Sequence, residues 1–203
     1  MFRKIFNLFC PRLHKRKYDF VFSIGAACTC TDMLRNCKLQ DFSYPFDWVW
    51  GGGPRVRFDY LLSEFDGYFD KSDFVLEHMT SNTHHAVWRN IKTGVVYNHD
   101  FQENTDNLDD SWDEVHEKYQ RRFNRLLSML HEKSRIAVIY LERPNHADPV
   151  ATRDELRQIY RKLKNKYPNK TLLDIYYIRQ VDTQKSPRIK RLNNHLFDIS
   201  LDY

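Results

Sequence analysis

The chain has 203 residues, of which 41% are hydrophobic and 29% are charged, a composition typical of a folded globular domain. Its formal net charge is +5, but residues 1–17 hold six Lys or Arg and no acid, which leaves 26 basic and 27 acidic residues elsewhere. A nearly neutral body argues against a broad nucleic-acid-binding face, and no apolar run is long enough to span a bilayer.

The N-terminal segment 1–17 mixes apolar side chains with cations and predicts a short amphipathic helix on an anionic membrane surface, or else a solvated terminus. It is a poor signal peptide, because charges interrupt its apolar stretch. We therefore divide the chain into a basic tail, 1–17, and a single α/β domain, 18–203. We expect a cytoplasmic protein, with the tail as its peripheral contact to the inner face of the membrane. The chain has four cysteines: Cys10, Cys28, Cys30 and Cys37. They lack zinc-ribbon spacing, so we expect no metal. Because the N-terminal segment is a poor signal peptide, we expect their thiols to be reduced.

Strands and helices alternate along the chain. An apolar run at 20–24 predicts a first strand that stops at Gly25, and the segment 31–37 predicts a first helix. Further strands are predicted at 135–141, 172–178 and 196–201. Capping-box patterns predict helices that begin at Ser111 and Thr152. This order predicts an α/β fold with a mostly parallel sheet flanked by helices.

An aromatic-rich insertion, 39–110, follows the first helix. Within it we predict a helix over 58–65 and a hairpin formed by 86–90 and 94–98. So long an insertion is typical of a binding region or a lid.

Cys28 falls at the turn from the first strand into the first helix. Unpaired backbone N–H groups and the positive end of a helix favour a thiolate there, which suits a nucleophile. The alternative is a small cysteine buried at the end of a strand. As a nucleophile, it would use the backbone around Gly25 and Ala27 to hold an oxyanion.

A cysteine nucleophile needs a base, and His99 is our first choice because it ends the second hairpin strand between two polar neighbours. The alternative is a structural histidine; His146 and His195 are the second and third choices. The carboxylate that orients the imidazole is either the adjacent Asp100 or Asp47, which lies among aromatics.

Two more segments are candidates for binding substrate. Trp48 closes the aromatic segment Phe42–Trp48, while Arg143 and Asn145 follow the predicted strand 135–141. Because the carboxyl ends of parallel strands share one edge, we expect Arg143 near Cys28, where it would clamp an anionic group or stabilise an oxyanion.

Three motifs in order, Ser-Ile-Gly-Ala-Ala-Cys at 23–28, Phe-Ser-Tyr-Pro-Phe-Asp-Trp at 42–48 and Asn-His-Asp-Phe at 98–101, resemble a family described as papain-like cysteine peptidases. The resemblance covers roughly residues 18–180. It implies Cys28 as nucleophile, His99 as base, Asp47 or Asp100 as the third group, and hydrolysis of an amide, ester or thioester bond.

Two alternatives remain open. The Gly-Ala-Ala-Cys turn is also similar to a motif of capsule-polysaccharide acetyltransferases, which implies an acyltransferase of surface polysaccharide biosynthesis. Coenzyme A is a candidate acyl donor under this alternative, but the sequence does not identify the donor. The other alternative is a non-catalytic accessory protein that binds a glycan or a membrane. The partners we expect are a peptide, acyl or glycan substrate and no nucleic acid, and the hydrolase itself needs no cofactor.

Overall fold

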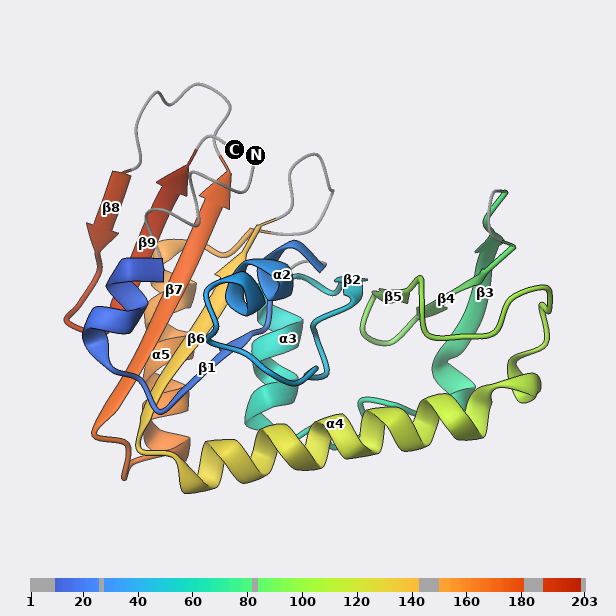
Figure 1. Ribbon diagram of the computed structural model, residues 1–203, viewed down its shortest axis with the longest axis horizontal. Helices are drawn as coiled ribbons and strands as arrows, with labels where there is room; N and C mark the ends of the chain where they lie inside the picture. The colour runs from blue at the N-terminus through green and yellow to red at the C-terminus, as the bar shows by residue number, and fades with distance from the viewer. Residues whose placement is uncertain (1–9, 26–27, 82–83, 143–149, 181–187, 202–203) are drawn as a thin grey trace.

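The computed structural model describes residues 10–25, 28–81, 84–142, 150–180 and 188–201 (Figure 1). Its larger sheet has five strands in the order β1-β6-β7-β9-β8. Four of them are parallel: β1 (Phe20–Ser23), β6 (Arg135–Leu141), β7 (Leu172–Gln180) and β9 (Leu196–Leu201). The edge strand β8 (Arg188–Arg191) runs antiparallel to β9. The predicted α/β fold with a mostly parallel sheet is confirmed.

Helices cover both faces of this sheet. Residues 10–16, which we call the N-terminal helix, and α2 (Cys28–Asn36) pack on one face, where Leu13 and Met33 meet Val21. The other face is covered by α3 (Gly53–Leu62), α4 (Trp112–Glu132) and α5 (Arg153–Lys166). Side chains that alternate along each strand supply both cores, as expected for a sheet buried on both sides.

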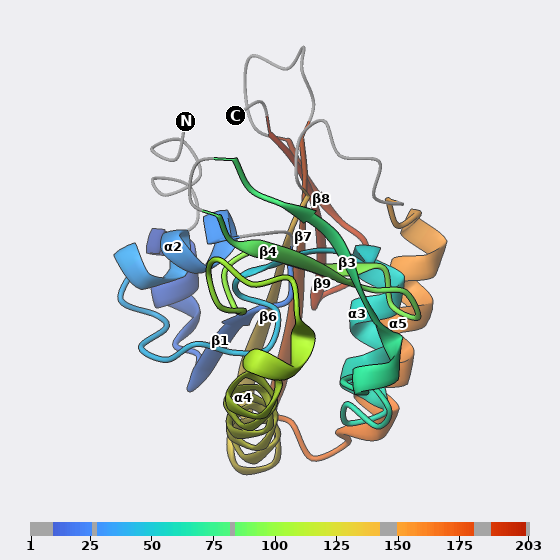
Figure 2. The same ribbon diagram turned by 90° about the vertical axis from the view of Figure 1, so that its right-hand side faces the viewer.

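The insertion forms a second, antiparallel sheet in the order β2-β5-β4-β3. Its strands are β2 (Val49–Gly51), β3 (Phe74–Met79), β4 (Ala86–Asn90) and β5 (Val95–Tyr97), and short 3₁₀ turns lie at Lys71–Asp73 and Leu108–Asp110. The predicted hairpin is confirmed as β4 and β5. Figure 1 shows α4 running below both sheets, and Figure 2 shows β3 and β4 of the second sheet in front of the larger sheet.

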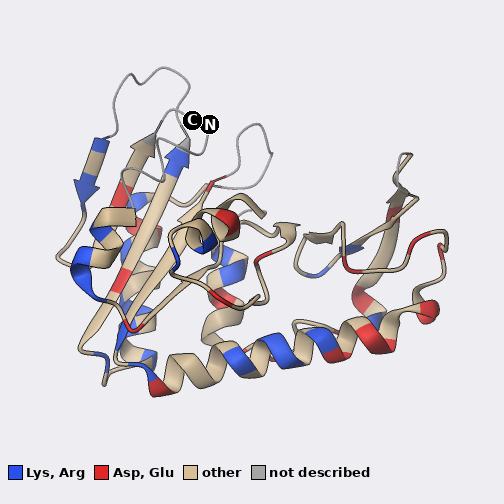
Figure 3. Ribbon diagram, in the orientation of Figure 1, with Lys and Arg blue, Asp and Glu red and all other residues tan. Residues whose placement is uncertain are grey.

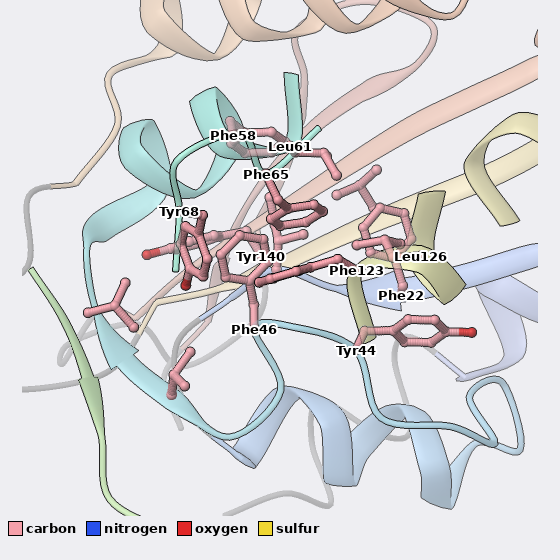
Figure 4. Close-up of a cluster of buried hydrophobic side chains, with 14 of the residues drawn as sticks. Phe22, Tyr44, Phe46, Phe58, Leu61, Phe65, Tyr68, Phe123, Leu126 and Tyr140 are labelled. Atoms are coloured by element: carbon pink, nitrogen blue, oxygen red, sulfur yellow. The ribbon is translucent and has the colours of Figure 1, made fainter. Parts of the chain in front are cut away.

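An aromatic core joins the two parts of the molecule (Figure 4). Phe46 lies 5.6 Å from Phe65 between ring centres, and Phe65 stacks on Phe123 of α4 at 4.6 Å. Aromatic pairs of this kind add about 1 kcal/mol each to the burial of their surface. The segment that carries Phe46 is therefore fixed in the core and is not a surface loop.

The two predicted capping boxes differ. At α5 the Thr152 hydroxyl accepts from the Glu155 N–H, and the Glu155 carboxylate accepts in return from the Thr152 N–H. At α4 the helix begins where predicted, but Ser111 makes no capping bond with its side chain. Its ψ of 0° departs from the extended backbone that places an N-cap hydroxyl over the first turn, so the predicted box is wrong there.

Half of the predicted basic tail packs against the sheet. The side chain of Leu13 is completely buried between the N-terminal helix and the sheet. Residues 1–9 lie outside the described residues. In the part of the chain that is described, no helix has both the length and the apolar character needed to cross a bilayer.

Candidate active site

The turn after β1 is built so tightly that only glycine fits at its centre. The Ile24 N–H donates to the Ile139 carbonyl at 2.9 Å, which ties the end of β1 to β6. A Cβ on Gly25 would lie 2.3 Å from the backbone nitrogen of Leu141, far inside contact distance. The Gly25 N–H donates to the Ser23 hydroxyl at 3.2 Å. These contacts fix the path of the chain just before the helix that carries Cys28.

Cys28 is the first described residue after this turn and the first residue of α2, and its side chain is half-buried. Cys30, two residues on, is completely buried, and burial raises the pKa of its thiol to about 12. The first-turn N–H groups of a helix lack intrahelical partners and attract negative charge. Of these two thiols, only Cys28 combines such a position with access to solvent. Ala27, our candidate for the oxyanion backbone, lies outside the described residues.

A buried arginine that the sequence analysis did not single out supports the same turn. Arg57 of α3 is completely buried and donates to the Ile24 carbonyl at 3.1 Å. It also donates to the Val49 carbonyl at 3.0 Å and twice to the Gly51 carbonyl, at 3.0 and 2.9 Å. One guanidinium therefore joins the end of β1 to β2. The helical pattern around Arg57 gave no sign of this, since its partners are backbone groups.

The Phe42–Trp48 segment packs along the face of α2 that carries Cys28. Thr31, three residues after Cys28 and on the same face, donates from its hydroxyl to the Asp47 carbonyl at 3.4 Å. One turn further along α2, Arg35 donates to the Ser43 hydroxyl at 2.8 Å, and its guanidinium carbon lies 5.2 Å from the centre of the Trp48 ring. The structure thus brings two of the three sequence motifs together.

Asp47 is the buried acid of this segment. Its carboxylate accepts from the Gln40 amide and from the Tyr44 N–H, each at 2.6 Å. Burial raises its pKa to about 6, although the Tyr44 N–H partly opposes the shift. A carboxyl of this kind exchanges its proton near neutral pH. Asp47 is a candidate orienting group, but its described partners do not include His99.

His99 follows β5 and is exposed to solvent. Its ring lies edge-on to that of His85, 6.4 Å away between centres, and the His85 Nε2 is 2.9 Å from the Glu103 carboxylate. No contact among the described residues joins His99 to Cys28, so the catalytic pair stays a prediction.

Asp100, the other candidate orienting group, is held by α4. Its carboxylate accepts from the Tyr119 hydroxyl at 2.8 Å and lies 2.8 Å from the Lys118 ammonium. The Arg122 guanidinium is 3.5 Å away. These contacts give Asp100 a structural role, which is to anchor the third motif to the long helix.

The same helix also holds the second motif. Arg125 donates to the Ser43 carbonyl at 2.9 Å. Burial raises the pKa of Asp47, and the positive charge of Arg122 only partly opposes that rise. Through α4 the Phe42–Trp48 and Asn98–Phe101 segments are fixed relative to each other and to α2.

The remaining candidates are placed as follows. Arg143 and Asn145 lie outside the described residues, as does His146. His195 sits near the amino ends of the strands, where its Nδ1 is 2.8 Å from the Asp174 carboxylate. Because Cys28 follows the carboxyl end of β1, the structure separates His195 from it. No group of three or more His, Cys, Asp or Glu side chains that could hold a metal occurs within the described residues.

Comparison with known proteins supports the resemblance seen in the motifs. A family model described as "Putative papain-like cysteine peptidase (DUF1796)" matches residues 19–181. No significant match was found among curated proteins or among solved structures. Since the family model spans most of the chain, including all three motifs, the protein belongs to the DUF1796 family, which carries that description.

Proposed function

We propose that the protein is a hydrolase that cleaves an acyl bond with Cys28 as its nucleophile. The observation that carries the proposal is the position of Cys28, half-buried at the start of α2 and directly after a turn fixed by Gly25 and Arg57. A nucleophile in this position needs little reorganisation, because the groups around it are already held in place.

The chemistry follows from the thiol and the helix start. The Cys28 sulfur attacks the carbonyl carbon of an amide, ester or thioester, and the thiol proton passes to the base. Backbone N–H groups in the first turn of α2 stabilise the oxyanion. When the tetrahedral intermediate collapses, the base returns the proton to the leaving group. Water then hydrolyses the thioester that remains on Cys28.

We assign the base to His99, because the family resemblance implies it and its exposed imidazole is able to accept a proton. Its backbone is positioned by the neighbouring Asp100, which α4 holds. We assign Asp47 to the support of the Cys28 face of α2, to which its carbonyl is bonded through Thr31. If Asp47 or Asp100 also orients the base directly, its carboxylate would raise the basicity of the imidazole.

A small cavity of about 110 Å³ is a candidate binding site for the acyl side of the substrate. It lies between the starts of α3 and α5 and is lined by Pro54, Val56, Val150 and Ala151 among others. Arg57, one turn into α3, is bonded to the Ile24 carbonyl beside the Cys28 turn. The walls are mainly apolar, which suits a short aliphatic or acetyl group better than a charged one.

The test uses the full chain with p-nitrophenyl acetate, an activated ester whose small acyl group and good leaving group favour attack by a reactive thiol. We expect Cys28→Ser to reduce turnover to the background rate and His99→Ala to lower it by roughly 10²–10⁴-fold. We expect a trapped acetyl thioester on Cys28, detected by mass spectrometry after rapid acid quenching.

Cys10→Ser is the matched control, because Cys10 is also a half-buried free thiol but lies on the N-terminal helix. It should leave turnover unchanged. Circular dichroism checks that each variant is folded. The assignment is wrong if folded Cys28→Ser retains full turnover, or if the acetyl group accumulates equally on Cys10.

A further inference from the structure

A cavity of about 500 Å³ lies between the N-terminal helix and the strands β7, β8 and β9. This volume is within the range of small-molecule sites in proteins. None of the candidate active-site residues lines it. The cavity is lined by three side chains of the helix and four of the strands: Arg12, Lys15, Arg16, Tyr176, Ile189, Arg191 and Phe197.

The lining is strongly cationic. Arg16 pairs at 2.7 Å with Asp174, a fully buried carboxylate that also accepts from the Tyr18 hydroxyl. Within the described part of the chain, the other three cations make no ion pair: Arg12, Lys15 and Arg191. Figure 3 shows basic residues on the N-terminal helix and on β8. The basic excess recognised in the sequence is thus partly gathered around one concave site.

Aromatic rings hold two of the guanidinium groups in place. The Arg16 and Arg191 guanidinium carbons lie 5.2 and 5.7 Å from the centre of the Phe197 ring. Phe197 itself stacks on Tyr176, with 4.7 Å between ring centres. A guanidinium held against a ring loses less freedom when it binds, and its planar set of donors matches the oxygens of a phosphate group.

We propose that this cavity binds a phosphomonoester, a ligand whose phosphate is held by Arg12, Lys15, Arg16 and Arg191. Three uncompensated positive charges match a phosphate dianion better than a single carboxylate. The volume leaves room for an attached group such as a sugar. The concave shape and the nearly neutral body of the chain disfavour an extended polyanion such as a nucleic acid. A phosphomonoester occurs in free sugar phosphates and in the headgroup of phosphatidic acid, and the experiment separates these two sources.

Isothermal titration calorimetry of the full chain with glucose 1-phosphate measures the soluble source, with glucose as the uncharged comparison. Co-sedimentation with vesicles that contain phosphatidic acid in phosphatidylcholine measures the lipid source. We expect binding of glucose 1-phosphate and none of glucose. Removal of three exposed cations of the cavity should weaken the binding of glucose 1-phosphate by at least about tenfold. The triple variant is Arg12→Gln, Lys15→Gln and Arg191→Gln.

A second triple variant removes the same charge from exposed positions on α4 and α5, away from the cavity. Its substitutions are Arg121→Gln, Arg161→Gln and Lys162→Gln. It should bind glucose 1-phosphate like the unmodified chain. Vesicle binding that depends on the cavity cations, without binding of glucose 1-phosphate, assigns the site to the lipid headgroup. The proposal is overturned if neither source binds, or if both triple variants weaken binding equally.

Discussion

Replacing Arg57 with methionine tests how much the buried guanidinium contributes to the fold and to the Cys28 turn. The side chain makes four hydrogen bonds to three backbone carbonyls, those of Ile24, Val49 and Gly51. Each carbonyl that loses a charged donor costs about 1–2 kcal/mol when it stays buried. Methionine fills much of the volume and removes the cost of burying the charge. We therefore expect a net loss of about 3–5 kcal/mol in the free energy of unfolding.

Urea unfolding followed by circular dichroism measures this loss. With a slope of about 2 kcal/mol per molar urea, the midpoint should fall by about 1.5–2.5 M. Arg55→Met is the matched control, because the Arg55 side chain is 71% exposed and its pair with Glu155 is at the surface; it should cost less than about 1 kcal/mol. A loss below about 1 kcal/mol for Arg57→Met would show that the three carbonyls find other partners and refute the role given to Arg57.

Four further substitutions test three other features by the same unfolding measurement. Because burial raises the Asp47 pKa to about 6, the folded state binds the Asp47 proton more tightly than the unfolded state does. Protonated Asp47 therefore stabilises the folded state, and this contribution is fully present below about pH 4. It is lost as the pH rises to about 6, which lowers the free energy of unfolding by on the order of 3 kcal/mol. Asp47→Asn should remove that part of the pH dependence, and an unchanged profile would contradict it. Gly25→Ala should cost at least about 2 kcal/mol, because its Cβ would meet the backbone of Leu141; a neutral effect would show that the turn can open. Thr152→Ala should cost about 1 kcal/mol, and Ser111→Ala only a few tenths, because only the threonine hydroxyl makes a capping bond. Equal losses at the two positions would contradict this reasoning.

The sequence predicted the larger sheet well because its strands are buried on both faces. The predicted bounds 135–141 agree with β6, in which every residue after Arg135 is apolar and buried. The strand 196–201 agrees with β9 in the same way. A short apolar run bounded by turn residues is typical of a strand that is buried on both faces, so the hydrophobic pattern was informative here.

Three strands were missed, and each lacks that pattern. All four residues of β8 are exposed, and five of the six residues of β3 are not buried. β2 has only three residues. Edge strands of this kind form because a neighbour offers backbone hydrogen bonds, which the sequence of the strand itself does not record.

The candidate site was predicted only in part for a similar reason. The motifs drew attention to Cys28, the proposed nucleophile, and to the Phe42–Trp48 segment, but the groups that hold them come from distant parts of the chain. Arg57 binds carbonyl groups, whose positions depend on the tertiary fold. Asp100 and Asp47 were both candidates to orient His99, and the sequence did not reveal that the Asp100 carboxylate accepts from Tyr119 of α4. Local sequence indicates which residues are unusual, whereas contacts between segments decide what each of them does.

The long helix α4 also sets the distance between the second and third sequence motifs. Tyr119 holds the third motif through Asp100, and Arg125 holds the second through Ser43. Tyr119 and Arg125 are six positions apart, so the helix spaces them by about 9 Å along its axis. Inserting one residue between them would turn one anchor by about 100° relative to the other, away from its partner. The number of residues in this stretch of α4 therefore cannot vary while both motifs stay attached to it.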